Sequence, residues 1–197
     1  MMRVGILAVQ GAFLEHKQIL YKLGADFVEL RKQEDISDID GLILPGGEST
    51  VQGKLLHELD MFEPLKKNIE EGLPVMATCA GLILLSRNIV NCNRKHFGTL
   101  PVNIRRNAYG RQLGSFKTRQ PLKGFGEFDM IFIRAPYIEA VDKGVDVLAE
   151  IDNHIVAVQY KNQIGLSFHP ELGEDYRIHQ YFLNLISNRC IHKQNVC

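Results

Sequence analysis

The sequence predicts a single domain built on a doubly wound α/β sheet flanked by helices. In its first half, short apolar runs alternate with segments whose apolar residues recur at helical spacing. Several of these runs end in glycine-containing loops, as buried parallel strands do where a ligand binds at their carboxyl ends. No proline- or serine-rich linker divides the 197 residues. We therefore expect a flavodoxin-like mixed sheet.

The first half supplies the parallel strands. They are expected at residues 4–9, 27–30, 41–44 and 75–78, as short segments that are mainly apolar and bounded by turn residues. Helices are expected at residues 13–23, 51–56 and 62–71, and another begins near residue 82. Gly24 ends the first of them, since glycine readily adopts the left-handed conformation after a helix.

After residue 88 the pattern changes to short strands separated by Gly, Asn and Asp turns. These strands are expected at residues 102–105, 113–117, 130–133, 147–151, 155–160 and 164–167. They favour a mixed or antiparallel extension of the sheet over a second domain. A last helix is expected at residues 176–187, capped by Asp175. The domain would then span residues 1–188, followed by a polar tail at 189–197.

Composition excludes several function classes. Lys+Arg and Asp+Glu balance at 23 each, so no basic field predicts nucleic-acid binding. No apolar run has the length of a membrane span, and the N-terminus lacks a signal-peptide pattern. The four cysteines form no CxxC pair, and the histidines lack metal-ligand spacing. We expect a cytoplasmic protein with reduced thiols, no metal and no cofactor.

Cys79 directly follows the expected strand at residues 75–78 and precedes a helix. Its small neighbours Ala80 and Gly81 suit a sharp strand-to-helix turn that pushes the sulfur above the sheet edge. The N-terminus of the following helix favours a thiolate at that place. Taken alone, a cysteine in an apolar run is more often an ordinary core residue. The remaining motifs favour a nucleophile.

His169 and Glu171 stand two residues apart at the end of the last expected strand. In an extended segment they project to the same side, and Pro170 fixes the backbone between them. A carboxylate on one imidazole nitrogen leaves the other free to take a proton from a thiol. A surface His-Pro-Glu turn is the alternative, but its place at a strand end favours catalysis.

Pro45-Gly46-Gly47 closes another expected strand. Glycines let the backbone approach a reacting group closely, so the N–H groups of Gly47 and Ala80 are the expected oxyanion donors. Pro-Gly-Gly is also a common turn, and the lysine of a phosphate-binding loop is absent. Pro45-Gly46-Gly47 is therefore a weak signal alone, and its interpretation as an oxyanion loop depends on the other motifs.

Together these motifs resemble those of class I (triad) glutamine amidotransferases. The resemblance is narrower to the glutaminase subunit of pyridoxal 5'-phosphate synthase and covers about residues 4–188. It is carried by Leu42-Ile43-Leu44-Pro45-Gly46-Gly47-Glu48-Ser49-Thr50, Arg106-Asn107-Ala108-Tyr109-Gly110-Arg111-Gln112, Ile133-Arg134-Ala135-Pro136-Tyr137-Ile138 and Ser167-Phe168-His169-Pro170-Glu171-Leu172.

The resemblance implies a role for each motif. Cys79 would be the nucleophile, His169 the general base and acid, and Glu171 the orienting carboxylate. The substrate L-glutamine would be held by Gly47, Glu48, Ser49, Arg106, Ile133 and Arg134. Ammonia would pass to a partner, a (β/α)₈-barrel subunit that makes pyridoxal 5'-phosphate. That compound would be the product of the complex and not a cofactor of this chain.

Gln10 and Gly11 follow the first expected strand, beside the glycine loop. We expect a docked synthase subunit to touch them and to bias the orientation of the loop peptide. Three rival interpretations remain: a non-catalytic docking module, a cysteine peptidase, and a glutaminase of another pathway such as imidazole glycerol phosphate synthase. The intact Cys-His-Glu set argues against the first, and motifs suited to a small amino acid argue against the second. Only the motifs beginning at Arg106 and Ile133 distinguish this chain from the third, a glutaminase of another pathway.

Overall fold

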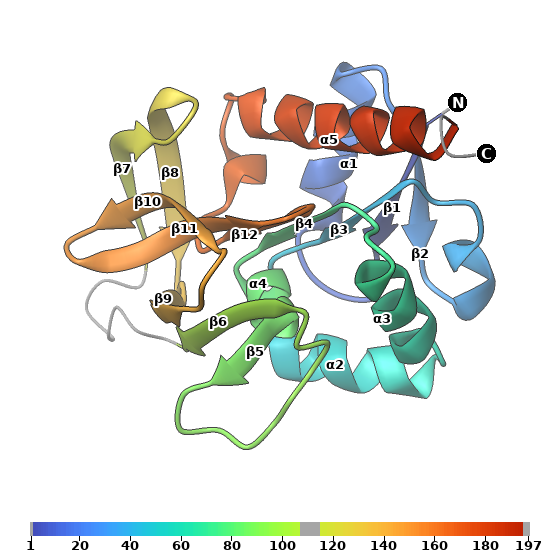
Figure 1. The fold of residues 1–197 in the computed structure, drawn as a ribbon, viewed down its shortest axis with the longest axis horizontal. Coiled ribbons are helices and arrows are strands. Elements are labelled where there is room, and N and C mark those ends of the chain that lie inside the picture. The colour runs from blue at the N-terminus through green and yellow to red at the C-terminus, as the bar shows by residue number, and fades with distance from the viewer. Residues whose placement is uncertain (1, 107–114, 195–197) are drawn as a thin grey trace.

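The computed structural model describes residues 2–106 and 115–194. Five parallel strands form the centre of its main sheet, in the order β2-β1-β3-β4-β12 (Figure 1). Their bounds are β1 Arg3–Leu7, β2 Asp26–Leu30, β3 Gly41–Leu44, β4 Val75–Thr78 and β12 Gln163–Leu166. This is the strand order of flavodoxin-like sheets, whose ligands bind where the order reverses, between β1 and β3. The predicted fold class is confirmed.

The second half of the chain extends this sheet. Strands β11, β9 and β6 continue from β12 with antiparallel pairing, and β5 pairs parallel with β6 at the edge. Their bounds are β5 Ser86–Ile89, β6 Leu100–Arg105, β9 Tyr137–Val141, β10 Asp146–Ile151 and β11 His154–Tyr160, with β10 paired to β11. The predicted mixed extension is confirmed, although β5 and β9 were not among the expected strands.

Helices cover both faces of the parallel strands (Figure 1). On one face lie α1 (Phe13–Lys22) and α5 (Arg177–Gln194), and on the other α2 (Ser49–Glu58), α3 (Phe62–Glu70) and α4 (Ala80–Leu85). Each face has its own apolar core because buried strand residues alternate between the two sides. Ile6 and Ile43 pack toward α5, while Leu42 and Leu44 pack toward α2 and α3.

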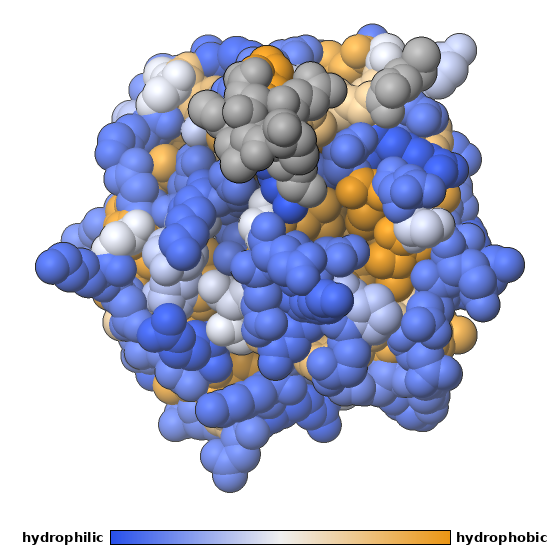
Figure 2. Space-filling view, turned by 45° about the vertical axis from the view of Figure 1, so that its right-hand side comes forward, coloured by the Kyte–Doolittle hydropathy of each residue, from blue (hydrophilic) through white to orange (hydrophobic). Residues whose placement is uncertain are grey.

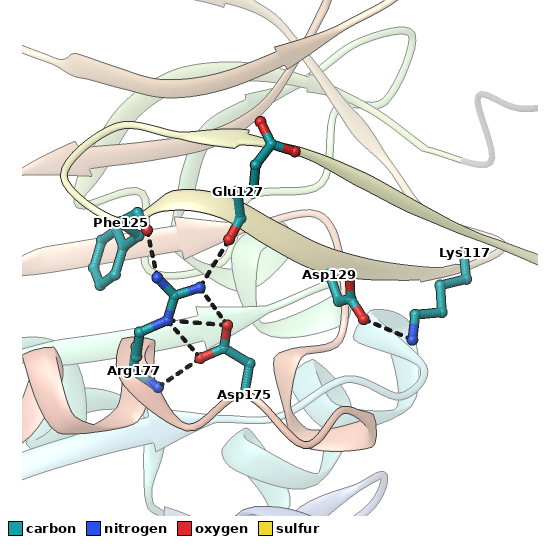
Figure 3. Close-up of polar contacts among 6 residues, drawn as sticks. All are labelled: Lys117, Phe125, Glu127, Asp129, Asp175 and Arg177. Atoms are coloured by element: carbon teal, nitrogen blue, oxygen red, sulfur yellow. Dashed lines mark hydrogen bonds and ion pairs between the residues drawn. The ribbon is translucent and has the colours of Figure 1, made fainter.

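Strands β7 (Ser115–Leu122) and β8 (Gly126–Ile133) form a separate two-stranded ribbon. Both run longer than expected, and residues 113–114 of the expected strand lie outside the described residues. The Arg177 guanidinium at the start of α5 donates hydrogen bonds to the carbonyls of Phe125 and Glu127 and pairs with Asp175 (Figure 3). The Asp175 carboxylate also accepts the backbone N–H of Arg177, the first residue of α5, at 3.1 Å. One arginine thus ties the ribbon turn to α5.

The expected end of the last helix, at residue 187, is wrong, because α5 continues to Gln194. No glycine or proline interrupts residues 177–194, so the sequence carries no stop signal there. The added turns also have contacts: Arg189 donates to the Glu71 carbonyl at 3.2 Å, and Cys190 packs on the core.

Two 3₁₀ turns complete the described elements, η1 (Gln33–Ile36) and η2 (Pro170–Leu172). None of the helices in the described ranges is long and apolar enough to cross a bilayer. Figure 2 shows a largely hydrophilic face with smaller apolar areas between the hydrophilic side chains.

Candidate active site

Cys79 lies in the turn between β4 and α4, as predicted. Its backbone adopts φ 47° and ψ −100°, a positive φ that few residues other than glycine tolerate. The Cys79 N–H donates to the Leu166 carbonyl at 2.8 Å, which anchors the turn to β12. A Cβ at Gly81 would lie 2.0 Å from the Leu44 carbonyl oxygen, so only glycine fits there. The Cys79 turn therefore requires glycine at position 81.

The sulfur of Cys79 is 4.0 Å from the Ile133 carbonyl oxygen at the end of β8. Cys79 is only 7% exposed, so the nucleophile candidate is nearly buried and does not lie on an open surface. Ile133, one of the predicted substrate-binding residues, is thereby placed beside the sulfur.

His169 follows β12, the strand beside β4, and lies at the same end of the sheet as Cys79. The register of β12 with β4 pairs Leu166 with Thr78, so the residues after both strands meet at one sheet edge. The His169 N–H donates to the Ile131 carbonyl at 2.8 Å, which holds this segment against β8. His169 therefore follows a strand end, as predicted, and that end lies at the same sheet edge as Cys79.

Glu171 faces His169 across a short contact, 2.6 Å between Oε1 and Nδ1. Both residues are buried, at 5% and 6% exposure. The expected backbone was extended, but Glu171 lies in the 3₁₀ turn η2, which begins at Pro170. Proline fixes φ at the first position of a helix, so the sequence favours a turn there. The two side chains meet nonetheless.

The protonation state of His169 follows from its neighbours. Burial on its own would lower the pKa of His169. Hydrogen bonds and charge interactions with Cys79 and Glu171 outweigh that effect and raise the pKa to about 10. The imidazolium form of His169 is therefore favoured at neutral pH.

The glycine loop after β3 reaches the same place. A Cβ at Gly46 would lie 2.3 Å from Cε1 of His169, so the imidazole packs directly against the loop backbone. The Gly46 carbonyl accepts the Ala12 N–H at 2.9 Å, and the Glu48 N–H donates to Oε1 of Gln10 at 2.9 Å. Gly47 and Glu48 are exposed at the mouth of the site.

Gly11 has φ 107°, and a Cβ there would lie 1.9 Å from the Gly46 carbonyl oxygen. Gln52 of α2 donates to the Gln10 carbonyl at 2.9 Å and to the Pro45 carbonyl at 3.2 Å. The loops after β1 and β3 are thus locked together, at the point where the strand order reverses.

The other predicted substrate residues are Ser49, Arg106 and Arg134. Ser49 is buried at the start of α2, and the half-buried Arg106 reaches Thr50 Oγ1 with its guanidinium at 3.4 Å. Arg134 is exposed, next to Ile133, with φ 44°. The remainder of the motif after Arg106, residues 107–112, lies outside the described residues.

Sequence reasoning missed two residues behind the His169–Glu171 pair, His16 of α1 and His179 of α5. Both are fully buried, and His16 Nε2 lies 3.5 Å from Glu171 Oε2. A histidine among the buried positions of an amphipathic helix was the available signal, since His16 shares a face with Ile19 and Leu20. Among the described residues no group of three or more His, Cys, Asp or Glu side chains could hold a metal ion.

Parallel strands that end in a cysteine turn, with a buried His–carboxylate pair beside it, define a site of the cysteine-hydrolase class. More narrowly, the chain belongs to the SNO glutamine amidotransferase family, whose model matches residues 6–188.

Its relatives are consistent with that placement. The pyridoxal 5'-phosphate synthase subunit PdxT of Desulfitobacterium hafniense (strain Y51) is 62% identical over 188 residues, covering 95% of this chain and 94% of the relative. PdxT of Streptococcus pneumoniae (strain ATCC 700669 / Spain 23F-1) is 53% identical over 192 residues, covering 95% and 100%. A crystal structure of a glutamine amidotransferase superposes with a TM-score of 0.89 at 43% identity, covering 93% of this chain and 98% of the other.

Proposed function

We propose that this chain is the glutaminase subunit of a pyridoxal 5'-phosphate synthase and hydrolyses L-glutamine to L-glutamate and ammonia. One observation carries the proposal. Cys79 stands in a strained turn after β4, and the 2.6 Å His169–Glu171 pair follows the adjacent strand β12. The curated relatives named as this subunit support the pathway, and they argue against a glutaminase of another pathway.

Each member of the triad has a step in the reaction. The Cys79 thiolate attacks the side-chain carboxamide carbon, and the N–H groups of Gly47 and Ala80 stabilise the oxyanion. His169 gives its proton to the departing ammonia. It then takes a proton from the water that hydrolyses the glutamyl thioester, which releases glutamate. Glu171 holds the imidazole in orientation and stabilises its charge.

The substrate is small and charged at one end. Arg106 suits the α-carboxylate because guanidinium groups bind carboxylates in a planar fork, and Thr50 already orients it from α2. Gly47, Glu48 and Ser49 border the amide end beside the oxyanion loop. Ile133 lies beside the sulfur, where it borders the reacting carbon, and Arg134 lies next to it at the rim.

The partner follows from the product. Ammonia released into water would be protonated and lost as a nucleophile, so the site requires a docked acceptor. A (β/α)₈-barrel synthase subunit that condenses sugar phosphates with ammonia is the proposed partner. We also propose a cytoplasmic location, which the free thiols of Cys79 and Cys92 support.

The test is glutamate release from L-glutamine by the purified chain, measured with and without the synthase subunit. We expect turnover in the complex and none with Cys79→Ala. Turnover that survives in Cys79→Ala would contradict the assignment, and an inactive wild-type complex would favour the docking-module alternative.

A further inference from the structure

Glu171 has a second carboxylate oxygen that the triad does not use. Oε1 contacts His169 at 2.6 Å, while Oε2 is buried and has no hydrogen bond of standard geometry within the described residues. A buried carboxylate oxygen without a donor is costly. His16 Nε2 lies 3.5 Å from that oxygen, at the outer limit of a hydrogen bond. A shift of a few tenths of an ångström would close the contact.

His16 is itself held from behind by His179. The two histidines come from α1 and α5, and His16 Nδ1 lies 3.0 Å from His179 Nε2. Their ring centroids are 5.2 Å apart with planes inclined by 50°. Both side chains are fully buried. His16 Nε2 also faces Thr78 Oγ1 at 3.5 Å, on the residue before the nucleophile. The pair therefore connects two helices to the floor of the site.

Both imidazoles are neutral. Burial, with the neighbouring His179 and His169, lowers the pKa of His16 well below its usual value, and burial lowers that of His179 to about 3. A neutral imidazole has one N–H and one bare nitrogen, so only two arrangements place a single proton between His16 Nδ1 and His179 Nε2.

The surroundings select one of them. If His16 carried its proton on Nδ1, its bare Nε2 would face the Glu171 carboxylate. The His179 Nε2 would then accept, leaving an N–H on the buried His179 Nδ1, which has no partner among the described residues. In the other arrangement His179 Nε2–H donates to His16 Nδ1, and His16 Nε2–H faces Glu171 Oε2. Within the His16–His179 pair, this arrangement leaves only the bare Nδ1 of His179 without a partner among the described residues.

We propose that His16 is a positioning residue of the triad, whose Nε2–H donates to Glu171 Oε2, and that His179 fixes the tautomer of His16. The carboxylate then accepts an N–H on each oxygen, from His169 and from His16, and cannot rotate away from the catalytic imidazole. Because the supporting pair is neutral, it adds no charge to compete with the His169 imidazolium. The proposal rests on the glutaminase function proposed above.

Two substitutions at His16, with side chains of similar length, separate the effect of its hydrogen-bond donor from the effect of its packing. In glutamine the amide nitrogen stands where Nε2 of histidine stands, so His16→Gln keeps the donor toward Glu171. His16→Leu fills similar space without it. In the assembled complex we expect His16→Leu to lower kcat about ten- to hundredfold, the effect of losing a hydrogen bond to a charged group. We expect KM for glutamine to stay within about twofold and His16→Gln to recover most of kcat.

Two controls exclude a merely structural role. Ile19→Ala opens a cavity in the same helix, at a residue 3% exposed, and should lower the melting temperature without lowering kcat. In a Glu171→Gln background, His16→Leu should cost less than about threefold, because its effect passes through the carboxylate. Equal costs in both backgrounds, or no recovery with His16→Gln, would overturn the proposal.

A readout without turnover distinguishes this proposal from the function itself. Histidine side-chain ¹⁵N spectra of the wild-type chain report which ring nitrogen carries the proton. We expect His16 and His179 each as the Nε2–H tautomer, with the His16 signals shifted in His179→Leu. A Nδ1–H tautomer at His16 would refute the positioning role even in an active enzyme. An inactive wild-type complex with the expected tautomers would instead refute the glutaminase function.

Discussion

A Cβ on Gly46 would lie 2.3 Å from Cε1 of His169, so the loop after β3 and the His169 imidazole occupy adjoining space. The imidazole must move if any side chain is added there. Since Gly46 also accepts the Ala12 N–H at 2.9 Å, the loop cannot yield without losing that bond. The absence of a side chain at Gly46 is thus part of how His169 is placed.

Gly46→Ala should therefore reduce kcat by about a hundredfold or more, the cost of displacing a catalytic group by about an ångström. Gly173→Ala is the matched control: a Cβ there meets only the Pro170 carbonyl oxygen at 3.6 Å and the Asp175 nitrogen at 3.9 Å. The measurement is steady-state glutaminase kinetics of the complex. Gly46→Ala with the kcat of wild type would show that the imidazole tolerates the added methyl.

Cys79 should react with a glutamine-mimicking electrophile before any other cysteine. Its 7% exposure makes it a poor target for a non-specific thiol reagent, whereas Cys92 is exposed. We expect peptide mass spectrometry to find the glutamine analogue on Cys79 and simple alkylation on Cys92 first. Cys190 and Cys197 should lag behind with the analogue. Analogue found first on Cys92 would reject Cys79 as the nucleophile.

Glu171→Gln should lower activity less than His169→Ala does, by roughly ten- to a hundredfold, because the carboxylate is the least essential member of a triad. The hydrogen bond and charge of Glu171 are among the causes that raise the pKa of His169 to about 10. Without that charge the pKa of His169 should fall, and the alkaline limb of kcat/KM should move to lower pH. An unchanged profile would assign Glu171 a structural role only.

Acid should destabilise the fold through His16 and His179. The pKa of each is lowered by burial, so between about pH 6.5 and the folded value the unfolded chain binds more protons. The free energy of unfolding therefore falls as the pH falls below about 6.5, down to about 3 for His179. His169 has the opposite sign: its contribution is present below about 6.5 and is lost as the pH rises toward about 10.

Thermal unfolding at pH 7.5 and pH 5 measures the acid effect. We expect the melting temperature to drop less between these two values in His179→Leu than in wild type, since one buried titrating group is gone. Ile19→Ala, which removes buried apolar volume but no titrating group, is the control and should keep the wild-type drop. Equal drops in all three proteins would show that His179 does not take up a proton on unfolding.

The sequence predicted β3 and β4 with the observed bounds because both are short apolar runs between turns. It missed β5 (Ser86–Ile89) and β9 (Tyr137–Val141), whose exposed central residues blur the pattern. It could not show that β7 and β8 leave the main sheet, since strand pairing is a long-range property.

The candidate site shows the same contrast between local patterns, which the sequence reveals, and long-range contacts, which it does not. Cys79, His169 and the glycine loop were predictable because each occupies a strand end, and parallel strand ends share one edge. His16 and His179 were not, because they lie 163 residues apart and meet only when α1 and α5 cover the same face of the sheet. Helix periodicity predicts that a residue is buried but not which buried residue it contacts.

The last prediction concerns activation by the partner. Oε1 of Gln10 accepts the Glu48 N–H at 2.9 Å, and a Cβ at Gly47 would lie 2.4 Å from that same oxygen. Gly11 and Gly47 are exposed, so a docked synthase subunit can reach both loops. Because glycine admits either peptide orientation at little cost, docking can decide whether the Gly47 N–H faces the oxyanion.

An oxyanion with one donor in place of two costs roughly a hundredfold or more in rate. We expect the free chain to hydrolyse glutamine at least that much more slowly than the complex. Gln10→Ala should remove most of the stimulation because the loop loses its link to the docking face, whereas Gln33→Ala, exposed on η1, should keep it. The measurement is kcat for each chain alone and with saturating partner. A free wild-type chain as fast as the complex would mean that the oxyanion site is preformed and that docking serves only to guide ammonia.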